Sequence, residues 1–567
     1  MLKNQELAKH VLESITLAQQ AAMELIQAIE NGNDALAETI ADNIKELLLE
    51  LFQTGKQLST EEPILNLDNY CDTLIDSLER SLRFIIDNRE KVLHKIEFEF
   101  FPLLQDVYLH FYFWGCVYPD PERMKYYYEH EKKVLIANLY IEEAEKSGKY
   151  KYDVSILVPA YNKLDYTKQC IESILKTVPK SINYELILIN NGSTDGTKEY
   201  FESISPTKQI DIKINSIRGL TAYRIIEGEY TIVISNDIIV TENAIENMLH
   251  CIKSDPQIGW AVPTTSAISN LQEVPLYYSN MDEMLSAAAY NNHYDPFRHE
   301  QRTRLCNPVH IWRSSTAFSK VGVLGHFFTD PRNYFSYPDD VLSMLFRRNG
   351  YKNVLVKDAY CYHFGTVTHR DAMNVESQQE TYAQGRQHFI DQFGVDPWDI
   401  GSCYDPNMVQ LVELLPFEQI NILGINSGLG SNPLKIKELY KEEQHKLNTT
   451  VYNVTDQQTY IDDLRGVSDY IKFIKNINCI FKISDENFPN TFHHIIINAP
   501  PYPVHLRQKL IAYHKLIMNY KLIIDCIDHL DTDGSLYVNC EKKIIKLLMR
   551  VLFPRSSFSA NWIKIKK

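Results

Sequence analysis

The chain has 567 residues, 44% of them hydrophobic and 23% charged, so it can form several domains with buried cores and is not disordered in bulk. Its 58 basic and 73 acidic residues give a formal net charge of −15, which argues against non-specific nucleic-acid binding, because that binding relies on basic surface. A phosphate-bearing ligand would therefore have to be held by local positive charge or by a metal ion.

The cysteines and the N-terminus predict a cytoplasmic protein with no transmembrane segment. The 10 cysteines include no CxxC pair, and the closest two are Cys526 and Cys540. This scatter fits reduced, mostly buried thiols better than disulfides or a zinc site. The first residues contain no apolar signal-peptide core, and the most apolar window, 103–118, is interrupted by polar residues and too short to span a bilayer.

Residues 1–150 are predicted to form an all-α domain. Apolar residues recur at helical spacing before a break at Asn31-Gly32, then over about 35–54, and again from Leu74 towards Ile86. Such stripes usually pack in a core, and acceptor docking or homo-oligomerisation is the alternative. The aromatic run Phe111–Trp114 suits either stacking on an acceptor or packing against the next domain, and packing is favoured.

A β-α-β unit begins the central domain, predicted over 151–400. Apolar runs at 154–160 and 184–189 flank a segment whose apolar residues recur at helical spacing, which predicts two buried parallel strands joined by a helix. Each strand ends in a polar loop, where open α/β sheets bind their ligands. In the second loop, Gly192 permits a sharp turn and Ser193 to Asp195 can cap the next helix.

These two loops resemble those of family-two glycosyltransferases with the GT-A fold. The resemblance rests on Ser155-Ile-Leu-Val-Pro-Ala-Tyr-Asn162 and on Asn190-Asn-Gly-Ser-Thr-Asp-Gly-Thr197. It implies an α/β domain that binds a nucleotide-diphosphate sugar as donor. The residues expected to bind the donor are Pro159, Tyr161, Asn190, Asp195, Arg218, Gly219 and Asn236. Relatives often carry Asp at position 190, but an Asn carbonyl can also accept a hydrogen bond from a base, so a UDP-sugar is favoured.

After a strand predicted around 210–215, a further strand begins at Tyr230 and ends in Asn236-Asp237. A carboxylate there can hold Mg²⁺ or Mn²⁺ against a departing diphosphate, because these cations prefer oxygen ligands. The resemblance makes Asp237 a variant of the family's Asp-x-Asp motif. It also implies that His363, in a His-x-Gly sequence after a later strand, completes the metal site.

The carboxylate pair Asp339-Asp340 opens a predicted helix that ends at Asn349-Gly350. Acidic residues there also complement a helix dipole. The family places its catalytic base at this point, and residue count favours Asp339 whereas pairing of the acidic doublets favours Asp340. Such a carboxylate can take the proton of an acceptor hydroxyl as it attacks the sugar, and the resemblance implies inversion. Residues 263–310 are read as an acceptor-side region or a solvated loop.

Residues 417–567 are predicted to form a second α/β domain, Rossmann-like. A strand over 417–425 leads into the glycine loop Gly424–Gly430, and the order of later strands resembles the class-one methyltransferase fold. Relatives often carry an acidic residue before the first loop glycine, but Ile422 and Leu423 stand there, and no clear acidic residue ends the second strand near 451–454. A degenerate, non-catalytic module is therefore favoured over a methyltransferase.

The sequence thus predicts a multi-domain chain that is all-α, then GT-A, then Rossmann-like. The predicted activity is a metal-dependent hexosyltransferase acting on a bacterial surface glycan or protein. Two alternatives stay open. One is a bifunctional enzyme that also methylates through the C-terminal domain, and the other is a catalytically silent sugar-nucleotide-binding scaffold.

Overall fold

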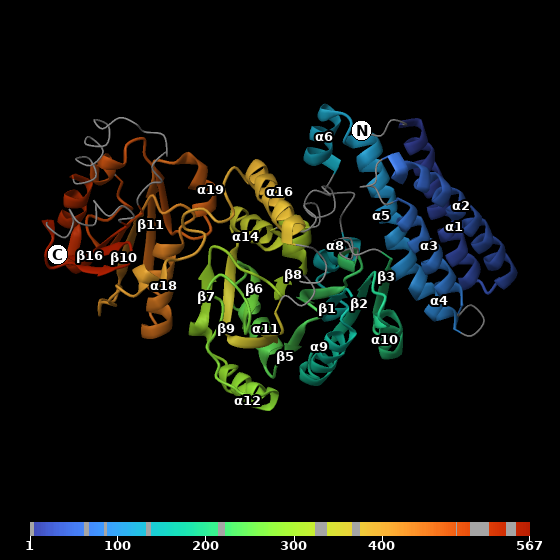
Figure 1. Ribbon diagram of the computed structural model, residues 1–567, viewed down its shortest axis with the longest axis horizontal. Helices are drawn as coiled ribbons and strands as arrows, with labels where there is room; N and C mark the ends of the chain where they lie inside the picture. Colours follow the sequence, from blue (N-terminus) through green and yellow to red (C-terminus); the bar gives the residue numbers. More distant parts are fainter. Residues whose placement is uncertain are drawn as a thin grey trace. The chain divides into compact units, whose positions relative to one another are not determined.

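A computed structural model describes residues 5–61, 67–83, 88–131, 138–213, 222–323, 337–365, 375–482, 485–498, 521–539 and 552–567 (Figure 1). Its contacts divide the chain into two compact units. The first comprises Met1–Glu246, Pro308–Phe335 and Cys361–Gln379, and the second Asn247–Asn307, Ser336–Tyr360 and Glu380–Lys567. We describe each unit by itself.

The first unit opens with the predicted helices, coloured from blue to teal in Figure 1. These are α1 (Gln5–Glu30), α2 (Asp34–Glu61), α3 (Leu67–Leu82), α4 (Arg89–Lys95), α5 (Phe101–Tyr112), α6 (Pro121–Tyr126) and α8 (Leu139–Ser147), with short π-helical turns η2 (Ile96–Phe100), η3 (Phe113–Val117) and η4 (Tyr127–Glu131). The apolar stripes are buried, as Ile15, Ala18 and Leu25 are fully enclosed. Asn88 and Asn138 accept hydrogen bonds from the first turns of α4 and α8 and so cap them.

The same unit contains a sheet of order β3-β2-β1-β4-β8. Its strands are β1 (Tyr152–Ala160), β2 (Tyr184–Asn191), β3 (Lys208–Ile212), β4 (Gly228–Ile234) and β8 (Val309–Arg313). The first four are parallel, with Val154 opposite Tyr184 and Tyr230, and β8 runs antiparallel to β4. Helices α9 (Leu164–Thr177) and α10 (Thr197–Ile204) follow β1 and β2. The predicted β-α-β unit is therefore present, and the carboxyl ends of four parallel strands share one edge.

The first unit also holds β5 (Ile238–Val240), the start of α11 (Ala244–Ser254), the π-helical turn η7 (Thr316–Val321) and the end of β9 (Lys352–His363). Strand β5 pairs antiparallel with β9, so that Ile238 lies opposite His363. This pairing brings the residues after β4 next to the last residue of β9.

The second unit contains the rest of the central domain. Its elements are β6 (Ile258–Thr265), α12 (Met281–Asn291), β7 (His299–Arg302), α14 (Pro338–Arg348), most of β9 and α16 (Val375–Phe393). The loop interpretation of residues 263–310 is wrong in part, because helix α12 and strand β7 lie within it. Asn280 caps α12 by accepting a hydrogen bond from Glu283, and β7 pairs with β9. Strand β7 is short and polar, and α12 buries only Met284, Ala288 and Asn291, so neither element shows a long apolar period in the sequence.

The C-terminal part of the second unit is a seven-stranded sheet of order β12-β11-β10-β13-β14-β16-β15. Its elements are β10 (Ile420–Ile425), α18 (Ser431–Gln444), β11 (Thr449–Thr455), α19 (Ile461–Leu464), β12 (Tyr470–Phe473), β13 (Phe492–Ile497), β14 (Leu530–Asn539), β15 (Ser557–Ser559) and β16 (Trp562–Lys566). Strands β10 to β14 are parallel, and β16 is antiparallel to β14 and β15. An α/β domain is confirmed here, and its Rossmann-like class stays a prediction.

In the described part of the chain, the cysteines and the helices agree with what the sequence predicts. Its nine cysteines are all free, and six of them are buried. None of its helices combines the length and apolar content that crossing a bilayer requires.

Candidate donor and catalytic site

The loops that follow β1, β2 and β4 are joined by hydrogen bonds at the carboxyl edge of the first unit's sheet. Asn162, after β1, donates from its backbone N–H to the Ser193 hydroxyl (2.8 Å) and accepts from the Thr194 N–H (2.8 Å). Its φ of 54° is left-handed, a conformation that Asn tolerates better than most residues. Asn162 thus fixes the first two loops to each other, a role that the sequence motif did not reveal.

Asp195 joins the same loops from the other side. Its carboxylate accepts from the Leu164 N–H at the start of α9 (2.8 Å) and from the hydroxyl of Thr197 at the start of α10 (2.6 Å). Burial alone would raise the pKa of Asp195, but the hydrogen bonds from Thr197 and Leu164 outweigh it and lower that pKa. The predicted capping role is present, and contact with a nucleoside stays a prediction.

The two asparagines that replace family carboxylates are both buried and both bonded within the protein. The Asn190 carbonyl accepts from the Ser193 N–H (3.0 Å). The Asn236 amide donates to the Asn162 carbonyl (3.2 Å) and to the Thr167 hydroxyl (2.9 Å), which fixes the β4 loop to the β1 loop. An ionised aspartate could not donate to the Asn162 carbonyl, and it could bond to the Thr167 hydroxyl only if that hydroxyl gave up its own bond to the Lys163 carbonyl.

Asn236→Asp is therefore expected to lower the free energy of unfolding by about 1–3 kcal/mol, since it leaves the Asn162 carbonyl without its donor and places a buried carboxylate beside it. Thermal unfolding at neutral pH would measure the loss. Asn236→Ala serves as the control, because it removes the bonds without adding charge and should cost less. An unchanged unfolding temperature for Asn236→Asp would contradict the role of Asn236 in fixing the β4 loop to the β1 loop.

Asp237 and His363 come together, as the sequence predicts. His363 Nε2 lies 3.3 Å from Asp237 Oδ2, and the Phe364 N–H donates to the Asp237 carbonyl (3.1 Å). The β5–β9 pairing produces this contact between residues far apart in sequence. Among the described residues, no group of three or more His, Cys, Asp or Glu side chains is placed to hold a metal ion. The pair thus offers one carboxylate and one imidazole.

Of the other four residues expected to bind the sugar donor, the structure describes two. Pro159 lies in β1 opposite Ile189, and Tyr161 follows β1; both are half-buried. Arg218 and Gly219 lie outside the described residues.

Asp339 and Asp340 lie in the second unit, in the first turn of α14. Asp340 is 5% exposed and forms an ion pair with Arg304, whereas a half-buried Asp339 accepts from the Asn307 N–H (3.3 Å). Burial raises the pKa of Asp339 to about 7, and the Asp340 charge adds to the rise, while Asn307 and Arg304 oppose it. Burial also raises the pKa of Asp340, against the opposing charge of Arg304. The two neighbouring carboxylates are therefore not equivalent.

An aromatic cluster that the sequence did not predict lies beside this pair. The ring of Tyr337, just before α14, meets Trp398 edge-on with centroids 5.2 Å apart. The guanidinium groups of Arg304 and Arg386 lie 5.9 Å and 5.1 Å from the Trp398 ring. Trp398 is still 49% exposed. Its position at the predicted domain exit gave no sign of this contact with the carboxylate helix.

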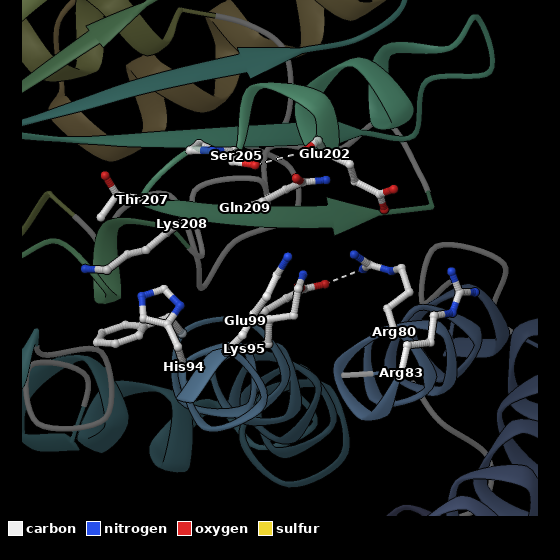
Figure 2. A pocket seen from close by; sticks show the side chains of 13 residues that line it. Arg80, Arg83, His94, Lys95, Glu99, Glu202, Ser205, Thr207, Lys208 and Gln209 are labelled. Atoms are coloured by element: carbon white, nitrogen blue, oxygen red, sulfur yellow. Dashed lines mark hydrogen bonds and ion pairs between the residues drawn. The ribbon is translucent and has the colours of Figure 1, made fainter. Parts of the chain in front are cut away.

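A pocket of about 300 Å³ separates the helical domain from the turn between α10 and β3 (Figure 2). Two of its buried cations are paired with carboxylates. Arg80 pairs with Asp76, Glu99 and Asp211, and Lys208 pairs with Glu185 and Glu227. Lys208 begins β3, so the pocket lies at the amino end of that strand, away from the loops described above. It is not a second candidate for the donor site.

Comparison with known proteins finds sequence matches to glycosyltransferases. Residues 155–321 match Glycosyl transferase family 2. Over 102 residues the chain is 31% identical to the glycosyltransferase GlyG of Streptococcus pneumoniae, covering 17% of this chain and 33% of that protein. It is 30% identical over 107 residues to a UDP-Glc:alpha-D-GlcNAc-diphosphoundecaprenol beta-1,3-glucosyltransferase, WfaP of Escherichia coli, covering 18% and 42%. The chain thus spans less than half the length of either relative.

Among solved structures, S. aureus TarS 1-349 in complex with UDP-GlcNAc is 17% identical, with 42% of this chain and 67% of that chain covered. The TM-score is 0.30, too low to support an inference. The sequence matches carry the conclusion instead: residues 155–321 of the chain match the glycosyltransferase family 2 model. The resemblance described above is confirmed to that extent.

Proposed function

We propose that this protein is a glycosyltransferase that moves a sugar from a nucleotide-diphosphate donor to a hydroxyl of a bacterial surface glycan or protein. The family 2 match supports the reaction class. The observation that carries the proposal is the Asp237–His363 pair, which lies in the unit that carries the strand-end loops. A UDP-sugar is the favoured donor, because the Asn190 carbonyl has a second lone pair for the base beyond the one that Ser193 uses.

The pair fits a divalent cation such as Mn²⁺ or Mg²⁺. One carboxylate with one imidazole leaves most coordination positions to donor phosphates and water, which is how such cations are commonly held in phosphate-binding sites. A bound cation would neutralise charge on the departing diphosphate. The protein's own contribution is to hold the backbone of Asp237 through the Phe364 N–H, so that the residue carrying the carboxylate is held in place before the donor arrives.

For the proton transfer, the contacts favour Asp339 over Asp340. Asp340 is engaged by Arg304, whereas Asp339 has a pKa of about 7, near the pH at which a general base works best. Asp339 would take the proton of the acceptor hydroxyl as that oxygen attacks the anomeric carbon. Attack opposite the departing diphosphate inverts that carbon.

The proposal is tested by nucleotide release from UDP-, GDP- and dTDP-sugars, with Mn²⁺, Mg²⁺ or a chelator. Slow hydrolysis of one donor, lost with the chelator, would establish the reaction class and identify the sugar. If no donor releases its nucleotide, and no combination of nucleotide and metal stabilises the protein thermally, the scaffold alternative is favoured.

Asp237→Ala is expected to abolish metal-dependent nucleotide binding while the fold stays intact, because the Phe364 bond uses the backbone of residue 237. Calorimetric titration with UDP and Mn²⁺ would measure the loss. Asp165→Ala is the control, since Asp165 is exposed on α9. Binding that persists unchanged in Asp237→Ala would show that the metal site is wrong.

A further inference from the structure

The C-terminal sheet shows where its domain would bind a ligand. In chain order its first five strands are arranged 3-2-1-4-5, as in doubly wound nucleotide-binding folds. In such sheets the ligand lies outside the carboxyl ends of the strands where the order reverses, here β10 and β13. The glycine loop Asn426–Gly430 follows β10 at that point and leads into α18. In folds of this type, N–H groups at such a position face a phosphate or cofactor.

In this chain those N–H groups face the chain's own linker between the central and C-terminal domains. The Leu429 N–H donates to the Ile400 carbonyl (2.8 Å), and the Ser431 N–H donates to the Gly401 carbonyl (3.2 Å). The loop and the first residues of α18 are almost entirely buried. Two peptide carbonyls therefore use donors that a bound anion would require.

The fit between loop and linker leaves no space for a side chain. A Cβ added at Gly428 would lie 1.9 Å from the Ile400 carbonyl oxygen, and one at Gly401 would lie 2.2 Å from the Ser427 oxygen. Both glycines have positive φ, of 59° and 78°. Glycine is required at each position by backbone conformation and by close approach of a second backbone segment.

We propose that the ligand of this glycine loop is the chain's own segment Ile400–Gly401, and that the C-terminal domain works without a cofactor as a brace for the carboxylate helix α14. The same segment continues back to Asp399, which accepts from the Tyr460 hydroxyl (2.6 Å), and to Trp398, beside Arg304. Arg304 pairs with Asp340 at the start of α14. The occupied loop thus holds the linker that packs beside the catalytic carboxylates. The brace role rests on the proposed transfer reaction, whereas the occupancy of the loop does not.

Hydrogen exchange of the full-length protein tests the occupancy. The amides of Leu429 and Ser431 should exchange at least about 100-fold more slowly than in an unstructured chain, because both are bonded and buried. S-adenosylmethionine, NAD⁺ and ATP at about 1 mM should change neither this exchange nor the unfolding temperature. Rapid exchange at both amides, or saturable stabilisation by any of the three, would overturn the proposal. Neither measurement uses a sugar donor, so failure here is distinct from failure of the transferase proposal.

Gly428→Ala and Gly394→Ala form a matched pair of variants. Both glycines have positive φ, but a Cβ at Gly394 meets nothing within 4 Å. Gly428→Ala should displace the linker and speed exchange at Leu429 and Ser431 at least about tenfold, with Gly394→Ala near wild type. Equal exchange rates at Leu429 and Ser431 in the two variants would contradict the contact between the glycine loop and the segment Ile400–Gly401. If Gly428→Ala does not fold, the wild-type exchange and cofactor titrations still decide the proposal.

Discussion

Asp339→Asn is expected to lower kcat for glycosyl transfer by about 10²–10⁴-fold, the usual contribution of a general base, with little change in the KM for the donor. Asparagine keeps the size of the side chain and can still accept the Asn307 N–H bond. Only the ability to take a proton is lost. Steady-state kinetics with the identified donor would measure it, and a loss smaller than fivefold would mean that another group is the base.

The pH dependence distinguishes Asp339 from its neighbour. Because the base must be ionised, kcat should fall about tenfold per pH unit below the Asp339 pKa of about 7. The Asp340 charge helps to raise that pKa, so Asp340→Asn should shift the acid limb to lower pH while activity at high pH is largely kept. If Asp340→Asn instead removed activity at every pH, the two roles would be reversed.

The raised pKa of Asp339 also predicts how the stability of the fold depends on pH. Its pKa is raised from 3.8 in the unfolded chain to about 7 in the fold, so the folded state is relatively favoured below the lower value and loses stability as the pH rises through the interval. Above pH 7 the folded protein keeps a buried charge that Asn would not carry. Asp339→Asn should therefore be less active and yet slightly more stable at pH 8, which is common for residues at functional sites.

The sequence was sufficient to predict the elements that local pattern determines. The strands around Val154–Ala160 and Tyr184–Asn191 are apolar, and their loops end in polar motifs, so both strands and the sheet edge they share could be predicted. The pairing of Asp237 with His363 could be predicted only through the family resemblance. Nothing in the spacing of these two residues shows that β5 and β9 are neighbours.

The sequence could not show which side chain meets which. Asn236 looked like a weakened metal motif, but its amide joins two loops, a contact set by tertiary structure. Asp339 and Asp340 differ only through Arg304 and Asn307, which lie more than thirty positions earlier. Strand β7 is polar and helix α12 is short with few buried residues, so apolar periodicity predicts neither of them.

The flanking domains hold the central domain by buried polar contacts in both units. In the first unit, Arg224 pairs with Asp106 (3.0 Å), and the Asn138 amide donates to the carbonyls of Tyr223 (2.7 Å) and Ile226 (3.1 Å). Charged pairs that are buried this deeply require close geometry. They therefore tolerate alternative packings less well than apolar contacts do. This supports a fixed positioning role for the helical domain, beside its predicted roles in docking or oligomerisation.

In the second unit, Asp463 is the residue whose loss should matter most for stability. It is fully buried in α19 and lies 3.2 Å from Arg347 and 3.0 Å from Arg348, at the carboxyl end of α14. Asp463→Asn removes the carboxylate charge that balances these two guanidinium groups. Breaking a buried ion pair from one side costs about 3–5 kcal/mol, because the remaining charge stays in a poorly solvated place.

The control is the next residue along the chain. Asp462 pairs with Arg465, but both side chains are 63% exposed, so Asp462→Asn should change stability by less than about 1 kcal/mol. A chain with several domains does not unfold in one step, so local opening of α14 and α19 by hydrogen exchange is the appropriate measurement. If Asp463→Asn frees both helices and lowers kcat, the C-terminal domain holds the helix that carries Asp339. If α14 opens without any change in kcat, the contact stabilises the domain but does not position the base.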